Sequence, residues 1–127
     1  MKMTPIGAKS APQASGGYSQ AIEVVGIKRQ LFISGQIPID ADDNVPNNFD
    51  DQARLVWKNI EAQLKSAGMG LQNIVKHTTF LSDRKYRSEN SRVRQEVLGK
   101  HAPALTVIIA DIYDEDWFLE IEAIAMD

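Results

Sequence analysis

Apolar residues recur every three or four positions between residues 48 and 68, which is the spacing of one face of an α-helix. Asn48 can cap the start of this helix, and Gly68 can end it in a left-handed conformation. The apolar stripe consists of Ala53, Val56, Ile60, Leu64 and Ala67. This pattern predicts an amphipathic helix that packs one face against a core.

A second helix is predicted over residues 84–98, with Ser82 or Asp83 as its cap and Gly99 at its end. Asn90 lies on the face of this helix that should point inward. The other members of that face are Tyr86, Val93 and Val97. Burying an amide costs free energy unless the amide is hydrogen-bonded. Asn90 therefore either ties a loop or strand end in place or contacts a ligand.

Shorter apolar or alternating runs predict the strands. They cover residues 18–25, 30–34, 74–81, 105–112 and 117–125. We expect the first two strands to pair as a hairpin, because few residues separate them. Residues 1–16 contain prolines and glycines and are predicted to form an irregular loop.

The resulting order is β-β-α-β-α-β-β in a single α+β domain over residues 1–127. Each helix links strands that can lie parallel through a right-handed crossover, so both helices should cover the same face of one mixed sheet. The strand at 105–112 is apolar on both faces, but the helices can cover only one. A partner subunit is the simplest cover for the second face.

Composition narrows the functional classes. The chain has 127 residues, a formal net charge of −3 and no cysteine. The negative charge gives no general attraction to a phosphate backbone, so nucleic-acid binding would need a local basic patch. The absence of cysteine excludes disulfides and thiolate chemistry. No segment has the apolar length of a signal peptide or membrane span, so we expect a cytoplasmic protein with no membrane contact.

Two carboxylates on the last strand are the first candidates for chemistry. Period two places Glu120 and Glu122 on one face, together with Phe118 and Ile124. The two carboxylates would then lie roughly 6–7 Å apart along the strand. That separation suits a hydrolytic pair, and it equally suits two charges on a solvated edge. From these residues alone, both interpretations stay open.

Other polar positions are weaker signals. Ser34-Gly35 ends the second strand and offers a hydroxyl and an approachable backbone to a ligand. His77 and His101 have no ligand-like spacing, so no metal site is predicted. The second helix carries a basic run that is either a solvated face or an anion site. Its members are Arg84, Lys85, Arg87, Arg92 and Arg94.

Four segments together resemble the RidA/YjgF family, the reactive intermediate (enamine/imine) deaminases. They are Gly17-Tyr18-Ser19-Gln20-Ala21, Ser34-Gly35-Gln36-Ile37-Pro38, the strand at 74–81 and Glu120-Ile121-Glu122-Ala123-Ile124-Ala125. The likeness runs from about Ala11 to Met126 with the motifs in the family's order. It implies a chorismate-mutase-like fold in a homotrimer, with a central barrel of sheets, helices outside and a cleft at each subunit interface.

The resemblance also implies a reaction and a site. In the family, each cleft binds a small 2-imino or 2-keto acid and hydrolyses the imine to a keto acid and ammonia, without a metal or organic cofactor. By matching motifs, Tyr18, Ser34, Gly35 and Asn90 are expected to line the cleft. Glu120 is expected to hold the attacking water, with Glu122 in a supporting role.

One position departs from the family pattern. The active deaminases read Pro-x-Arg-Ser/Thr before the fourth strand, and that arginine binds the substrate carboxylate. Here Leu105 stands in its place, in the segment Pro103-Ala104-Leu105-Thr106. Losing a bidentate arginine contact, which also fixes orientation, can cost ~100-fold or more in turnover. Leucine makes this part of the pocket apolar, so the substrate is expected to differ.

Three hypotheses follow from Leu105. The chain deaminates imines with a new carboxylate anchor, Arg92 as first choice or Arg94; or it hydrolyses a less anionic substrate through Glu120; or it is a non-catalytic trimer that binds a small ligand or a partner protein. We favour hydrolysis, because the glutamate is retained. Ribonuclease activity, attached to parts of the family, is disfavoured by the acidic net charge and by an expected lack of exposed aromatic residues.

Overall fold

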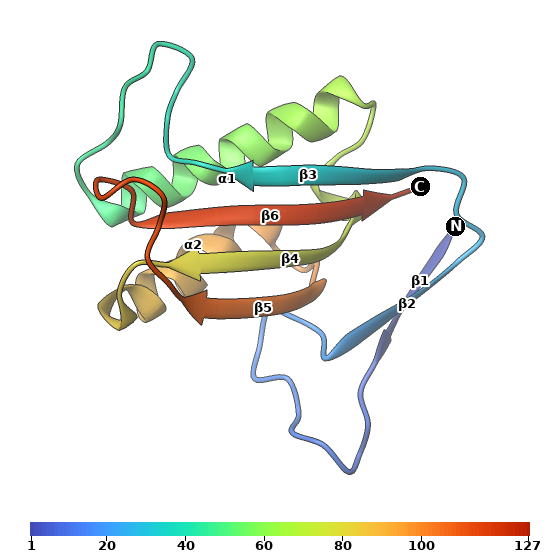
Figure 1. Cartoon of the computed structure of the whole chain (residues 1–127). Helices are drawn as coiled ribbons and strands as arrows, with labels where there is room; N and C mark the ends of the chain where they lie inside the picture. Colours follow the sequence, from blue (N-terminus) through green and yellow to red (C-terminus); the bar gives the residue numbers. More distant parts are fainter.

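A four-stranded mixed sheet organises the chain, and the computed structural model describes all residues from 1 to 127 (Figure 1). Its strands lie in the order β3 (Gln30–Gln36), β6 (Leu119–Met126), β4 (Ile74–Leu81) and β5 (Ala104–Ile109). β6 is antiparallel to both of its neighbours, whereas β4 and β5 are parallel. The helix-linked strands β3 and β4 therefore run the same way, as do β4 and β5, which confirms the predicted mixed sheet.

Two helices cover one face of this sheet (Figure 1). They are α1 (Phe49–Ser66) and α2 (Arg87–Leu98), and short 3₁₀ turns precede β4 (Leu71–Asn73) and α2 (Arg84–Tyr86). The α+β class and the placement of both helices on a single face are as predicted. None of the helices is long and apolar enough to cross a membrane.

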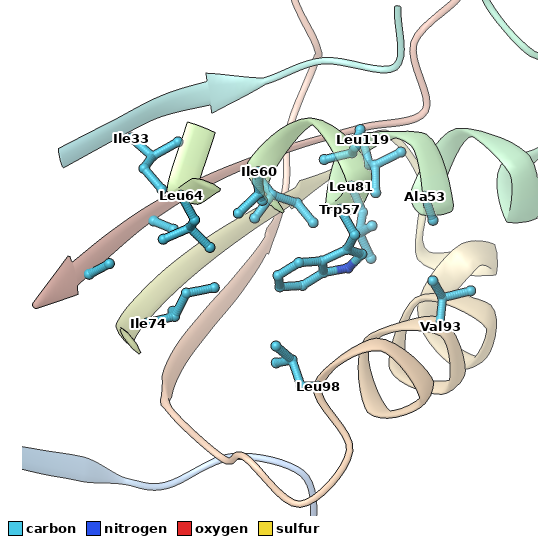
Figure 2. Close-up of a cluster of buried hydrophobic side chains, with 14 of the residues drawn as sticks. Ile33, Ala53, Trp57, Ile60, Leu64, Ile74, Leu81, Val93, Leu98 and Leu119 are labelled. Atoms are coloured by element: carbon cyan, nitrogen blue, oxygen red, sulfur yellow. The ribbon is translucent and has the colours of Figure 1, made fainter. Parts of the chain in front are cut away.

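The core lies between the sheet and the helices (Figure 2). On β6, Leu119, Ile121, Ala123 and Ala125 are buried by period two, while Glu122 is exposed. Large side chains from the other elements complete the cluster: Trp57, Ile60 and Leu64 of α1, Val93 and Leu98 of α2, and Ile74 and Leu81 of β4. Burying each of the larger apolar side chains stabilises the fold by about 1.5–3 kcal/mol.

The predicted ends of α1 are confirmed. The Asn48 side chain accepts a hydrogen bond from the backbone N of Asp51 at 2.9 Å. At the other end, Gly68 has φ +73° and Met69 N donates to Leu64 O at 2.8 Å. This is a Schellman ending, in which a left-handed glycine lets the chain turn back onto the last helical carbonyls.

Replacing Asn48 by alanine is expected to lower the free energy of unfolding by about 1 kcal/mol, because the amide of Asp51 loses its acceptor. Urea denaturation at neutral pH measures the change. Asn47→Ala is the matched control, since this neighbouring asparagine is exposed and makes no capping contact. Equal losses in the two variants would contradict the capping role.

The N-terminal region corrects two predictions. Residues 1–16 are not wholly irregular, because β1 (Lys2–Ile6) pairs antiparallel with β2 (Ala21–Val25) in a separate ribbon. β2 and β3 do not form the expected hairpin, since β3 pairs with β6 instead. The reason lies at Lys28 and Arg29, whose amides donate to Asp127 O and so align β3 with the C-terminus of the chain. Pro5 is tolerated because β1 pairs on one side only.

The sheet face opposite the helices carries exposed apolar residues. Phe32 of β3 is 70% exposed, and Ile108 of β5 is 44% exposed. β5 ends at Ile109 rather than Ile112, and its side chains are at least partly exposed on both faces. Phe118 is the exception to the predicted alternation: it precedes β6 and packs on the core against Tyr86, with ring centroids 5.2 Å apart. The face lacks a cover within this chain.

Candidate functional site

A pocket of about 500 Å³ lies on the helix side of β5. It is bounded by α2, by the ends of β4 and β5, and by the loop that leads into β2. Three residues singled out from the sequence, Tyr18, Asn90 and Leu105, line it together. Arg94 lines it as well. The volume falls within the range of pockets that hold small molecules.

Backbone contacts hold Tyr18 at this pocket. Ser19 Oγ donates to Ala102 O at 2.6 Å, and Ser19 N donates to Pro103 O at 3.0 Å, which fixes the loop to the start of β5. Gly17 has φ +72°, and a Cβ there would lie 2.8 Å from Gln95 Cγ, so only glycine fits. Hydrogen bonding from Ser15, together with the positive charge of Arg94, lowers the pKa of the Tyr18 phenol.

Asn90 enters the pocket from the inward face of α2. It is 4% exposed, and its side-chain amide makes no hydrogen bond within the chain. Asn90 therefore does not hold a loop or strand end in place, which was one of its two possible roles. The amide retains both a donor and an acceptor for a molecule in the pocket.

The basic run of α2 is split between two environments. Arg92 points away from the pocket, where Nη2 lies 2.8 Å from Asp50 Oδ1 and Nη1 lies 3.4 Å from Glu96 Oε1. The structure therefore does not bring Arg92 to Tyr18, Asn90 and Leu105. Arg94 is the arginine that it brings there. The signal was available in the sequence, because Arg94 follows Asn90 by four residues and so shares its helix face.

Glu120 occupies the opposite face of the sheet. A small recess of about 170 Å³ holds it, together with Phe80 and with Asp111, Ile112 and Tyr113 of the loop after β5. Partial burial, and secondarily the charge of Glu122, raises the pKa of the Glu120 carboxyl. The carboxyl is thus a stronger base than an ordinary glutamate.

Gly35 leaves room for this carboxylate because it has no side chain. The register between β3 and β6 shifts between Ile33 and Gln36, so the strand bulges at Ser34-Gly35. A Cβ on Gly35 would collide with Glu120 Oε2 and would lie 2.7 Å from its carboxyl carbon. The Ser-Gly pair and Glu120 thus form one local unit, with Ser34 exposed beside it.

The pocket lined by Tyr18 and the recess of Glu120 lie on opposite faces of the sheet within one chain. Leu81 lines the pocket on the helix side, and the preceding Phe80 lines the recess of Glu120. Adjacent residues of a strand project to opposite faces. One copy of the chain therefore cannot bring Glu120 to Tyr18, Asn90 and Leu105.

Comparison with known proteins identifies the family. The model of a family described as endoribonuclease L-PSP matches residues 8–127. A RutC family protein of Pyrococcus horikoshii is 38% identical over 119 residues, which is 92% of each chain. The chain belongs to the RidA/YjgF family. Within the RidA/YjgF family, TdcF of Escherichia coli, named as a candidate reactive intermediate deaminase, is 32% identical over 91% of each chain.

Solved structures agree with this assignment. The structure of TdcF with bound serine covers 98% of each chain with a TM-score of 0.73 and 32% identity. YyfB of Yersinia pestis, a Rid family protein of unknown function, covers 100% of each chain with a TM-score of 0.87. Its 22% identity establishes the shared fold alone.

Leu105 gives this RidA/YjgF chain an apolar pocket wall. It lies on β5 in register with His77 of β4, next to Val107 and Leu81 at the pocket surface.

His77 is 1% exposed, and neither ring nitrogen has a hydrogen-bond partner. No group of three or more His, Asp or Glu side chains is arranged to hold a metal ion.

Proposed function

We propose that this RidA/YjgF protein hydrolyses small imines or related C=N compounds at clefts between copies of the chain. The observation that carries the proposal is the Glu120 carboxylate, which is partly buried over Gly35 and made more basic by burial. TdcF, a relative of this protein, is named as a candidate reactive intermediate deaminase, and this supports imine hydrolysis as the reaction class. We also propose that the protein acts in the cytoplasm.

Assembly into a homotrimer is part of the proposal. The Tyr18 pocket and the Glu120 recess lie on opposite faces of the sheet, so a cleft that uses both must take one from each of two copies. The exposed Phe32 and Ile108 on the uncovered sheet face supply apolar surface for such contacts. In this arrangement the sheets face one another and the helices lie outside.

The reaction we propose needs one water and one base. Glu120 accepts one proton from the water as the water oxygen attacks the imine carbon, and it passes this proton to the imine nitrogen to give a carbinolamine. The hydroxyl proton of the carbinolamine then moves to the nitrogen as the C–N bond breaks, so that ammonia leaves and the carbonyl product forms. The raised pKa of Glu120 suits this task, because a base is most effective when its pKa lies closer to the working pH.

A binding role is the second candidate, and Leu105 is the observation that favours it. Without the strand arginine of the family, the pocket could bind a small ligand or partner without turning it over. Endoribonuclease activity is less well supported. The net charge of −3 argues against RNA binding, but the expected lack of exposed aromatic residues was wrong, because Tyr113 is 95% exposed and Phe32 is 70% exposed.

The test is an imine hydrolysis assay. An amino-acid oxidase generates 2-iminobutanoate or 2-iminopropanoate in the presence of semicarbazide, and keto-acid release is compared for wild type, Leu105→Arg and a control without protein. Acceleration by wild type is the expected result. If only Leu105→Arg accelerates release, Glu120 is competent but the natural substrate is not this class of acid. If neither does, the binding role becomes the better account.

A further inference from the structure

We infer that Arg94 is the anion-binding residue of the pocket, and that its ligand is a carboxylic acid with an apolar tail packed against Leu105. This inference names the substrate class for the proposed function and rests on it for the claim that the ligand is a substrate. The binding claim itself rests only on the pocket. It places the carboxylate on helix α2 instead of strand β5.

Arg94 is a buried cation without an anionic partner. The residue is 5% exposed, makes no ion pair with any Asp or Glu, and has no partner at Nε. Its one polar contact within the chain is a long hydrogen bond of 3.5 Å from Nη2 to Gly16 O. Buried arginines are ordinarily paired, because an unpaired buried charge costs several kcal/mol. A ligand anion would supply the missing partner.

The charge distribution of the pocket points the same way. Arg87 also lines it, but no Asp or Glu does. The helical arginines that do have acidic partners, Arg92 of α2 and Arg54 of α1, lie outside this pocket, where they pair with Asp50 and Glu96. Asp50 and Glu96 thus neutralise the arginines on the side of α2 that faces away from the pocket. The side that faces the pocket, with Arg87 and Arg94, keeps its positive charge.

The lining has a polar half and an apolar half. Tyr18, Asn90 and Gln95 line the pocket together with Arg94 and supply neutral donors and acceptors, and Ser91 adds a hydroxyl. The opposite wall is apolar and consists of Leu81, Leu105 and Val107. A planar guanidinium matches a carboxylate through paired N–H donors, and the apolar wall matches an aliphatic tail. An amphiphilic 2-oxo or 2-imino acid satisfies both halves.

A carboxylate bound by Arg94 also explains the leucine at position 105. With the cation on α2, a leucine on β5 no longer leaves the carboxylate without a partner and instead forms the surface for the tail. Acids with a branched aliphatic tail should therefore bind more tightly than pyruvate.

Binding measured by isothermal titration, without turnover, tests the inference. The probes are 4-methyl-2-oxopentanoate, pyruvate, the neutral ketone 4-methyl-2-pentanone and inorganic phosphate. We expect wild type to bind 4-methyl-2-oxopentanoate most tightly. Arg94→Met should weaken that binding at least about 10-fold, the size of one charge-assisted contact. Arg92→Met, on the same helix but ion-paired outside the pocket, is the matched control and should change it less than about twofold.

One further variant and a stability measurement complete the test. Arg94→Lys retains the charge without the planar fork, so it should bind with intermediate affinity even if the methionine variant folds poorly. Thermal unfolding of Arg94→Met should show no loss of stability, because an unpaired buried charge has been removed. Unchanged binding in both Arg94 variants, or tighter binding of the ketone or phosphate by wild type, would overturn the inference. Arg94-dependent binding without imine hydrolysis would support the anchor and reject only the proposed reaction.

Discussion

Replacing Glu120 by glutamine is expected to reduce imine hydrolysis by at least about 100-fold, the usual contribution of a positioned general base. Glutamine preserves the shape of the side chain over Gly35, but its amide cannot accept the proton of the attacking water. Ligand binding should be largely retained, because the carboxylate of the ligand is held elsewhere. The oxidase-coupled assay gives the rate, and titration with a 2-oxo acid gives the affinity.

Glu122→Gln is the matched control for this experiment. Glu122 lies two residues further along β6 and is exposed, so its loss should leave most of the activity. Its charge raises the pKa of Glu120, so the control should move the acidic limb of the pH–rate profile to lower pH. If Glu120→Gln retains more than about a tenth of wild-type turnover, Glu120 is not the base.

Acidification between about pH 6.5 and pH 4 is expected to lower the free energy of unfolding by about 3 kcal/mol through His77. Burial, followed by the charges of Arg94 and His101, lowers the pKa of His77 to about 4. In this window the unfolded chain takes up a proton on His77 and the folded chain does not, so stability falls as the pH falls. Below about pH 4 both states bind the proton and the effect is complete. Urea denaturation over this range measures it.

His77→Leu is the variant that isolates this effect. Neither ring nitrogen has a partner, so leucine leaves no polar group unsatisfied and retains apolar packing near Trp57. The variant should lose most of the slope between pH 4 and 6.5. The lowered pKa of Asp50 contributes below this window, and the raised pKa of Glu120 opposes the trend. His101→Gln removes only the last of the three causes that lower the pKa of His77, so this variant should keep most of the slope. An unchanged slope in His77→Leu would contradict the assignment.

Local signals were enough to predict the helices and most of the sheet. The α1 stripe, the Asn48 cap and Gly68 act within a few residues, so their outcome does not depend on the rest of the chain. Strand partners do depend on it. The pairing of β3 with β6 joins residues nearly a hundred positions apart, and sequence proximity wrongly favoured a β2–β3 hairpin. β1 was missed because Pro5 hides an edge strand that needs a partner on one side only.

The candidate site was only partly predictable for the same reason. The gathering of Tyr18, Asn90 and Leu105 depends on a loop tied to the start of β5 by Ser19, which no local pattern reveals. Closeness in sequence favoured Arg92 over Arg94, whereas helical periodicity places Arg94 beside Asn90. The separation of Glu120 from this pocket follows from strand alternation, but it becomes apparent only when the sheet order is known.

The close approach of Gly35 to Glu120 links two positions that lie 85 residues apart in the sequence. A Cβ at position 35 would take the place of the Glu120 carboxylate, so a larger residue there requires that the glutamate side chain move or be replaced, whereas glycine is compatible with either state. Among homologues, we therefore expect residues larger than glycine at this position mainly in lineages that have lost the glutamate.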